Sequence, residues 1–461
     1  MNINTGARLD RLPMSRFHRR IMWLIGIGMF FDGFDIYIAS TVLGATLQSG
    51  FSTLGQNALF VSITFLGMML GSLGTGFLGD RYGRRFSYQA NLAVFGVASI
   101  ASAFAPNMSF LIVCRFFMGL GLGAENVVGY STLAEFVPPK ARGRQQGLMA
   151  AYVVTGLPVS ALIGLLLVPS LGWRVMYVIG GLGALGVWYA RKSLPESPRW
   201  LESVGRNAEA ESLIRKIEAE VESEHGPLPA PQNTRVQAAS RELGSLLTRP
   251  LFTRMVVGSI VLIVINTLLY GFVTWLPTFF VKEGMTIAKS FAFSLVMSLG
   301  APIGAMLGAF TADKVGRKPM IIGASAAAAL CGAIYPFVSD PILLPIVGLM
   351  LVIPIYVLVA LLFGMYVPEL FPTEIRLRAS GICNTFGRGA TIGSPFLVVS
   401  LFGNYGVMGV LALMITLLIV QIFVVALLGI ESSRRGLESL VEPGEGDASH
   451  PSAMPLSKAR H

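Results

Sequence analysis

The sequence has few charged residues, few cysteines and few histidines. Charged side chains make up 13% of the 461 residues and apolar ones 53%, which excludes an ordinary soluble domain because such domains are about 25% charged. The three cysteines lie at unrelated spacings inside apolar stretches, so neither a disulfide framework nor a metal site is predicted. The four histidines lie outside the apolar stretches, which argues against histidine-based catalysis within a membrane.

Long apolar segments make up most of the sequence. Twelve stretches of about 20 residues or more are long enough to cross a hydrocarbon core of about 30 Å as helices. They lie at 21–47, 57–79, 86–105, 109–136, 145–168, 173–193, 252–281, 290–312, 319–338, 342–367, 377–403 and 406–430. The prediction is an all-α integral membrane protein with twelve transmembrane helices.

Three short motifs recur at nearly one spacing, about 233 to 235 residues. The pairs are GDRYGRR at 79–85 with ADKVGRK at 312–318, Glu135 with Glu369, and Glu196 with Glu431. Such matches indicate an internal duplication, which is common among secondary transporters. We therefore predict two pseudo-symmetric six-helix bundles.

Basic residues gather on one side of the predicted spans. They occupy the N-terminal arm, the central connection and the tail, whereas the opposite loops at 48–57 and 105–109 carry no charge. By the positive-inside rule both termini are cytoplasmic, in a multi-pass protein of the inner (plasma) membrane. The net charge of +10 then reflects topology and contact with the lipid bilayer, and nucleic acid is not an expected partner. The predicted parts are a basic arm at 1–20, bundles at 21–193 and 252–430, a linker at 194–251 with an amphipathic helix at 207–224, and a largely disordered tail at 431–461.

Several of these segments resemble a known family. The loop at 76–85 is similar to the signature between helices 2 and 3 of the major facilitator superfamily. Segments 135–144, 195–200 and 431–436 are similar to its sugar porters and metabolite:proton symporters, and FDGFD at 31–35 resembles the aromatic acid:proton symporters. The resemblance covers about residues 17–440. It implies a secondary transporter rather than an enzyme, without a cofactor, in which two bundles move around a central site.

Five ionisable residues lie deep within predicted spans: Asp32, Asp35, Arg115, Glu125 and Arg388. A charge at mid-helix costs about 2.5–3.5 kcal/mol on insertion scales, so each should face a cavity or a partner and is a functional candidate. Asp32 and Asp35 are three residues apart and share one helix face. Two carboxylates this close repel when both are ionised, so at least one is expected to hold a proton.

Arg115 resembles the helix-4 arginine that pairs with a helix-1 carboxylate in proton-coupled sugar porters. The resemblance implies that Asp35 is its partner and that protonation of Asp35 releases it. The alternative is a static buried ion pair. Glu125 is either a second protonatable site, a hydrogen-bonding group for substrate, or a neutral acid satisfied by a neighbouring helix.

Arg388 favours an organic anion over a neutral sugar, because a planar guanidinium binds a carboxylate through two parallel hydrogen bonds. Asn266, Tyr270 and Thr274 recur every four residues and are predicted to line a substrate cavity, with Trp275 beside them. The alternative for this stripe is hydrogen bonding between helices.

The charged residues of the repeated loops are predicted to form a cytoplasmic gate, which holds one arrangement of the bundles until ligand and proton bind. Exposed ion pairs contribute only about 0–1 kcal/mol each, so such a network has to break collectively. The alternative is that these charges only fix topology. The predicted members are Asp80, Arg84, Glu135, Arg142, Glu196, Asp313, Arg317, Glu369 and Arg376.

The combined prediction is proton-coupled import of a small organic acid by alternating access, by a chain that works as a monomer. Two alternatives stay open. One is a proton-coupled or facilitative transporter of a neutral sugar or polyol, and the other is an efflux antiporter for metabolites or drugs.

Overall fold

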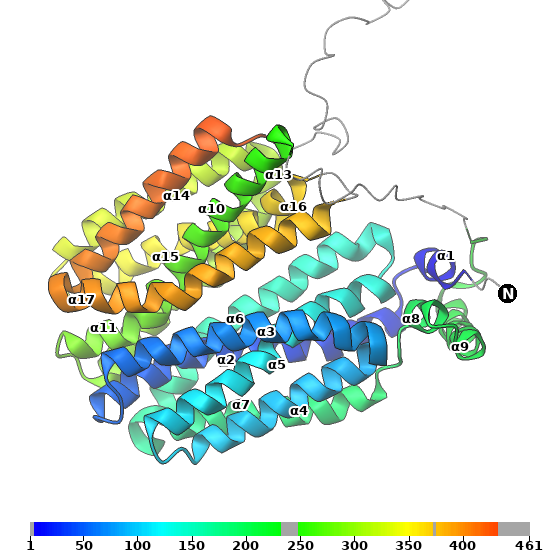
Figure 1. Cartoon of the computed structure of the whole chain (residues 1–461), viewed down its shortest axis with the longest axis horizontal. Helices are drawn as coiled ribbons and strands as arrows, with labels where there is room; N and C mark the ends of the chain where they lie inside the picture. The colour runs from blue at the N-terminus through cyan, green and yellow to red at the C-terminus, as the bar shows by residue number, and fades with distance from the viewer. Residues whose placement is uncertain (1–3, 232–247, 372–374, 432–461) are drawn as a thin grey trace, which may run out of the picture.

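The computed structural model describes residues 4–231, 248–371 and 375–431, and in these ranges it contains helices and no strands. The helices form two bundles that lie side by side (Figure 1). The predicted all-α membrane fold is confirmed. The predicted disordered tail, from residue 432 on, falls outside the described ranges.

The first bundle consists of six helices. They are α2 (Arg16–Gln48), α3 (Leu54–Tyr82), α4 (Arg84–Ala103), α5 (Met108–Phe136), α6 (Pro139–Leu171) and α7 (Arg174–Ala190), followed by the short turn η1 (Arg191–Ser193). Helix α2 begins five residues before the predicted span because Ser15 caps it, with its Oγ 2.9 Å from Nδ1 of His18. His18 therefore lies in the first turn of the helix and is buried, before the apolar stretch that begins at residue 21.

The second bundle contains interrupted helices. Its elements are α10 (Arg249–Gly271), η3 (Val273–Trp275), α11 (Leu276–Lys282), α12 (Ile287–Ser298), α13 (Gly300–Val315), α14 (Arg317–Ile334), η4 (Tyr335–Phe337), α15 (Leu343–Leu361), the π-helical turn η5 (Leu362–Tyr366), α16 (Val367–Glu369) and α17 (Arg376–Leu428). The spans predicted as continuous at 252–281 and 290–312 are each broken. Pro277 opens α11 after the first break, because proline lacks the amide hydrogen that continues a helix.

Helix α17 contains two spans. Its backbone is non-helical at Gly406, where φ is 62°, a left-handed conformation that glycine adopts without steric cost. Nine helices in the described ranges are long and apolar enough to cross a membrane, counting α17 once. The shorter α7 and the more polar α4 complete the twelve predicted spans.

Glycines bring helices into close contact in both bundles. A Cβ atom at Gly33 of α2 would lie 2.1 Å from the backbone oxygen of Val153 on α6. In the second bundle, a Cβ atom at Gly304 of α13 would lie 2.2 Å from the backbone oxygen of Ile353 on α15. Larger residues at either position would force the helix backbones apart, so glycine is what permits this close packing.

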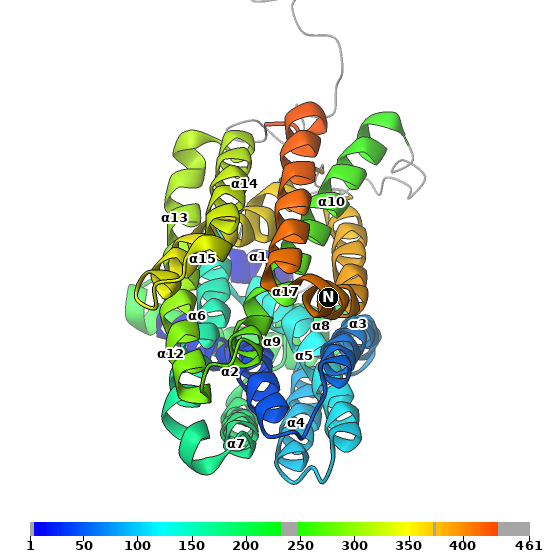
Figure 2. The ribbon, with the colours of Figure 1, turned by 90° about the vertical axis from the view of Figure 1, so that its left-hand side faces the viewer.

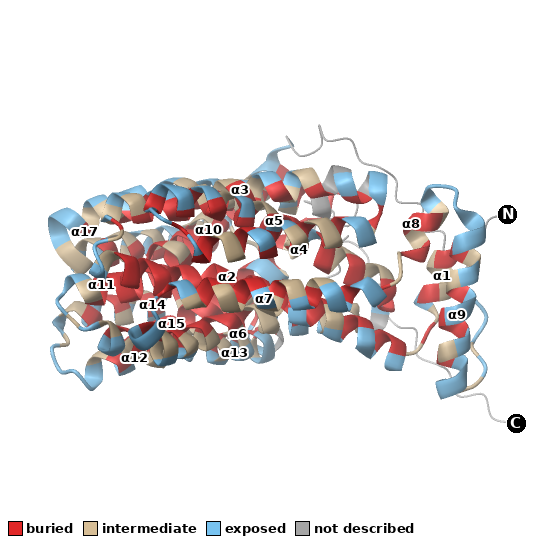
Figure 3. Ribbon diagram, turned by 90° about the horizontal axis from the view of Figure 1, so that it is seen from below, coloured by how far each residue is buried: buried red, intermediate tan, exposed pale blue. Residues whose placement is uncertain are grey.

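Three helices outside the spans form what we call the cap: α1 (Thr5–Asp10), α8 (Pro198–Ser203) and α9 (Asn207–His225). The amphipathic helix predicted at 207–224 is α9. Its apolar face packs on Leu9 and Phe17 rather than on lipid. Figure 3 shows the cap at one end of the molecule, with buried residues on its inner side. The opposite end, where Gln48 and Lys282 lie, is called the far end below.

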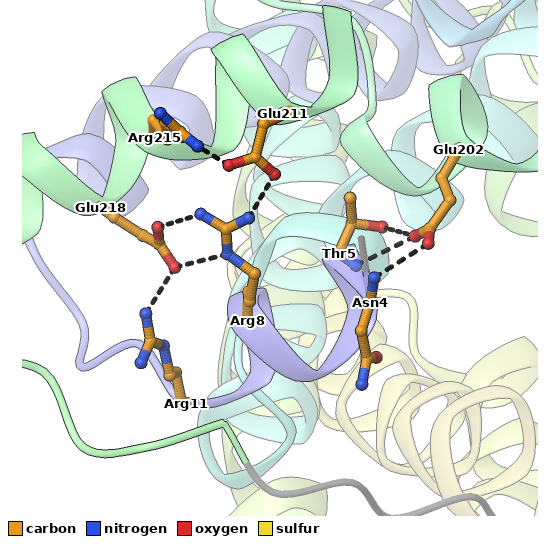
Figure 4. Close-up of polar contacts among 8 residues, drawn as sticks. All are labelled: Asn4, Thr5, Arg8, Arg11, Glu202, Glu211, Arg215 and Glu218. Carbon is orange, nitrogen blue, oxygen red and sulfur yellow. Dashed lines mark hydrogen bonds and ion pairs between the residues drawn. The ribbon is translucent and has the colours of Figure 1, made fainter. Parts of the chain in front are cut away.

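Polar contacts also attach α1 to the rest of the cap (Figure 4). Arg8 lies between Glu211 and Glu218, with Nε donating to Glu218 at 2.9 Å and Nη1 to Glu211 at 2.6 Å. Arg11 donates to the same Glu218 carboxylate at 2.6 Å. Burial alone would raise the pKa of Glu218, but hydrogen bonds from Arg8 and Arg11 and their charges outweigh it and lower this pKa.

The two bundles touch at the far end. Helix α2 packs on α11 and η3, and α6 packs on α12; Figure 2 shows the bundles from this end. The contact is tight at Gly44, where a Cβ atom would lie 3.1 Å from the Cβ of Pro277. The molecule is thus closed between its bundles at the far end.

Candidate functional site

Asp35 on α2 and Arg115 on α5 form a buried ion pair. Nη1 of Arg115 donates to Oδ2 of Asp35 at 2.6 Å, Nη2 donates to the backbone oxygen of Asp35 at 3.0 Å, and Nε donates to Oγ1 of Thr64 at 3.1 Å. Both charged side chains are at most 1% exposed. The structure thus brings together the two residues that the resemblance pairs, and the guanidinium has three fixed acceptors.

A small cavity lies beside Arg115, between the two bundles. Its volume is about 10 Å³, which is roughly the space that one water molecule needs. Thr64 and Phe65 of α3 line it on one side, and Tyr270 of α10 and Thr274 of η3 line it on the other. The buried ion pair therefore lies where the bundles meet.

Two tyrosines that were not predicted as site residues also connect the two bundles. The hydroxyl of Tyr356 on α15 donates to the hydroxyl of Tyr37 on α2 at 3.0 Å, and both side chains are buried. The rings of Phe65 and Tyr270 lie 4.3 Å apart at their centroids. Tyr37 lies two residues after the FDGFD motif at 31–35, and this proximity was the only signal in the sequence.

Arg388 lies in the first span of α17. Its Nη1 atom is inaccessible to solvent and has no hydrogen-bond acceptor among the described residues. Tyr270, which lines the cavity beside Arg115, also interacts electrostatically with Arg388. A guanidinium with an unused donor is therefore near the contact between the bundles.

Only part of the predicted polar stripe lines this cavity. Tyr270 and Thr274 line the cavity, whereas the amide of Asn266 donates to its own helix at Leu262 and packs on Gly387 of α17. Trp275 is fully buried and stacks on Phe279, with the ring planes 24° apart. Trp275 therefore packs within the second bundle instead of lining this cavity.

Glu125 does not line the cavity either, because it forms a second buried ion pair. Its Oε1 accepts from Nη1 of Arg191, and both side chains are 1% exposed. Arg191 also donates to the backbone oxygens of Leu24 at 2.9 Å and Ile25 at 3.0 Å. Sequence reasoning missed Arg191 because a basic residue at the end of a span is usually a membrane-surface charge.

The gate residues of the first bundle meet at the cap end. Nε of Arg84 donates to Glu135 at 2.9 Å, and the backbone N–H of Arg84 donates to Glu196 at 3.0 Å. Burial raises the pKa of Glu196, although backbone hydrogen bonds from Ser197, Arg85 and Arg84 oppose it. The carboxylate of Glu196 thereby caps the start of α4, where unpaired backbone N–H groups favour an anion.

The second bundle repeats this arrangement. Nε of Arg317 donates to Glu369 at 3.2 Å, and its backbone N–H donates to Glu431 at 2.9 Å. The duplication read from the sequence is thus a duplication of contacts, and each of these pairs lies within one bundle. Arg142 instead lies 3.6 Å from Asp10 of the cap. The side chains of Asp80, Asp313 and Arg376 lie outside the described part of the chain.

The sequence matches the Major Facilitator Superfamily over residues 25–395. The chain belongs to this superfamily. It is accordingly a multi-pass membrane transporter rather than an enzyme, as the resemblance implied.

Relatives in the major facilitator superfamily match nearly the whole chain. The inner membrane metabolite transport protein YdjE of Escherichia coli is 35% identical over 95% of this chain and 98% of its own length. The niacin transporter NiaP of Acinetobacter baylyi is 30% identical over 94% of this chain and 99% of its own length.

A solved structure of the superfamily has the same fold. The xylose transporter XylE from Escherichia coli, in a partially occluded inward-open conformation, aligns with a TM-score of 0.69 at 17% identity. The alignment covers 91% of this chain and 99% of that one. At this identity the likeness concerns the architecture of the two bundles alone.

Proposed function

We propose that this chain is a proton-coupled symporter that imports a small organic acid across the inner membrane. The observation that carries the proposal is the buried Asp35–Arg115 pair at the cavity between the bundles. An ionisable pair in this position can change the contact between the bundles when it gains or loses a proton. An ion pair whose only role was to stabilise one bundle would not need to lie next to the other bundle.

Protonation of Asp35 is the proposed coupling step. An ionised Asp35 holds Arg115 by charge, and a neutral Asp35 loses that attraction while its backbone oxygen and Thr64 still accept hydrogen bonds. The positive charge of Arg115 then has no counter-charge at the cavity. An anionic substrate that enters from the other bundle supplies one, so proton and substrate bind together.

Arg388 is the proposed anchor of the substrate carboxylate. It has a buried donor with no acceptor in the described part of the chain, and its neighbour Tyr270 also borders the cavity of Arg115. One small ligand placed at Tyr270 is thus near both guanidinium groups. The relative that is named a niacin transporter supports an acid with an aromatic ring, for which the rings of Tyr270 and Phe65 offer stacking surfaces.

The proposed cycle alternates between openings at the two ends. With both termini in the cytoplasm, closure at Gly44 and Pro277 corresponds to a periplasmic end that is shut and a site that faces inward. Rocking of the bundles at 21–193 and 252–430 then exposes the site to the other side, with the paired charge networks at the cap end as the proposed cytoplasmic gate. One chain contains the whole pathway, so we propose a functional monomer.

Uptake into proteoliposomes with an imposed inward proton gradient tests the function. Aromatic acids, aliphatic acids and neutral sugars are compared, and internal pH is recorded. Accumulation of an acid that collapses with a protonophore supports the proposal. Sugar uptake, or downhill movement that ignores the gradient, contradicts it and favours the alternatives for neutral sugars or facilitated transport.

A further inference from the structure

The guanidinium of Arg191 lies against the face of α2 that carries Asp32. A Cβ atom at Gly28 would come within 1.9 Å of its Nη2 atom, so glycine leaves the space that this group fills. Its acceptors Leu24 and Ile25 precede Gly28 by one helical turn, and Asp32 follows Gly28 by one turn. Arg191 lies in the turn that follows the last helix of the bundle, and its side chain therefore packs against the first helix.

Two buried carboxylates interact with this one guanidinium. Glu125 binds it directly, and Asp32 interacts electrostatically with both Glu125 and Arg191. Oδ2 of Asp32 and Oε2 of Glu125 are buried without a hydrogen-bond partner among the described residues. The other ionisable groups that face Asp32 are Asp35 on its own helix and Tyr130 on α5.

The charges of this region do not balance without a proton. The buried carboxylates described in α2 to η1 are Asp32, Asp35 and Glu125, and the buried guanidinium groups are Arg115 and Arg191. Full ionisation leaves one net negative charge in the membrane core, where an uncompensated charge costs several kcal/mol. Asp35 already has Arg115 as its counter-charge, so the missing proton belongs to Asp32 and Glu125.

We infer that Asp32 and Glu125 share one proton at Arg191 and form a second proton site between Asp35 and the cap end. The inference rests on the proposed proton coupling. Glu125 lies ten residues beyond Arg115 on α5, about 15 Å nearer the cap end. In the structure Arg191 binds Glu125, so the proton is on Asp32.

The site gives the proton a path out of Asp35. The proton of Asp32 first passes to Glu125, while Arg191 exchanges Glu125 for Asp32. Glu125 releases this proton to water at the cap end and pairs with Arg191 again, and the Asp35 carboxyl gives its proton to Asp32 at the same stage. Ionised Asp35 then pairs with Arg115, and Asp32 and Glu125 again hold one proton beside one positive charge.

Infrared spectroscopy of the reconstituted protein in D₂O tests the sharing, because only a neutral carboxyl group gives a carboxylic C=O band. We expect this band of Asp32 at neutral pH in the wild type and its loss in Asp32→Asn. Glu125→Gln should also remove it, since Asp32 then ionises against Arg191. Arg191→Gln should add a second neutral carboxyl, and Asp32→Glu should restore a band. Glu283→Gln, at an exposed position of the far end, is the matched control and should leave the spectrum unchanged.

The outcomes separate this inference from the proposed function. A band that survives in Glu125→Gln overturns the shared proton, and so does a wild-type spectrum identical to that of Asp32→Asn. Arg191→Lys retains the charge if Arg191→Gln fails to fold, and it should leave a single band. The spectra require no transport, so absence of acid uptake by the wild type contradicts the proposed function alone.

Discussion

At Arg388 the contributions of charge and of hydrogen-bond geometry to substrate binding can be separated. Arg388→Lys keeps a positive charge but loses the planar pair of donors. Loss of one charge-assisted hydrogen bond costs about 1.5–3 kcal/mol, so we expect the Kd of the transported acid to rise about 10- to 150-fold. Binding to the purified protein by calorimetry measures this change. Arg144→Lys, at an exposed position, should bind as the wild type does, and equal Kd values for the two variants would argue against Arg388 as the anchor.

Asp35→Asn tests the coupling of substrate to protons at a single residue. The amide keeps the size of the side chain but carries no charge and no exchangeable acidic proton. We therefore expect accumulation under an inward proton gradient to be lost, while Arg115 keeps its contacts with Thr64 and the backbone. Uptake with and without the gradient is the measurement. Gradient-driven uptake that persists in Asp35→Asn would leave the pair with a structural role.

Residue-level reasoning succeeded where a charge lies deep in an apolar segment. The deep position of Asp35 and Arg115 made them candidates, and they are in contact. Arg191 was missed because its place at a span end gives no such signal, although it is 1% exposed. Tyr37 and Tyr356 were missed because tyrosines are common in apolar segments. The depth of a residue within a span can be predicted from the sequence, whereas the partner of its side chain depends on how the other helices pack.

At the scale of elements, the attachment of α1 to α9 depends on Glu218, whose side chain is 10% exposed and receives hydrogen bonds from Arg8 and Arg11. Because the pKa of Glu218 is lowered, this contribution is complete above the ordinary glutamate pKa of about 4.3 and disappears as pH falls through the lowered value. Glu218→Gln should weaken the docking by about 1–3 kcal/mol at neutral pH. Hydrogen exchange of residues 5–10 reports it as faster exchange.

The same helix supplies a control for this experiment. Glu209 of α9 pairs with Arg206 at 2.6 Å, but its side chain is 56% exposed. An exposed pair contributes little, so Glu209→Gln should leave exchange in α1 unchanged. Equal effects of Glu209→Gln and Glu218→Gln would mean that total charge, not this contact, holds α1.

Helix positions were predictable and helix breaks were not. Twelve apolar segments identified the spans to within a few residues, because the length of an apolar run is what the bilayer requires. The breaks in the seventh and eighth helices do not interrupt that run. Pro277 was the one local signal for the first of them. The sequence also did not predict what α9 packs against, because an amphipathic pattern shows that one face of a helix is covered but does not show which element covers it.

At the scale of the whole molecule, sequence identifies the two halves but not which end is closed. The duplication gives each bundle the same charge network, Arg84 with Glu135 and Arg317 with Glu369, and in this structure both pairs lie within a bundle. The choice depends on contacts between the bundles, such as the hydrogen bond of Tyr356 to Tyr37. A small free-energy difference between the two arrangements decides which opening is populated.

Gly44 offers a direct test of that balance. A leucine at Gly44 would press on Pro277 across the closed far end, since even a Cβ atom would lie 3.1 Å from the Cβ of Pro277. Overpacking of this kind costs about 1–3 kcal/mol, enough to shift the equilibrium about 5- to 150-fold toward opening at this end. Spin labels at Gln48 and Glu283 should then report a longer distance by pulsed electron resonance. Gly55→Leu, where no atom lies within 4 Å of the added Cβ, should leave the distance unchanged; a longer distance in both variants, or in neither, would mean that the Gly44 contact does not govern closure.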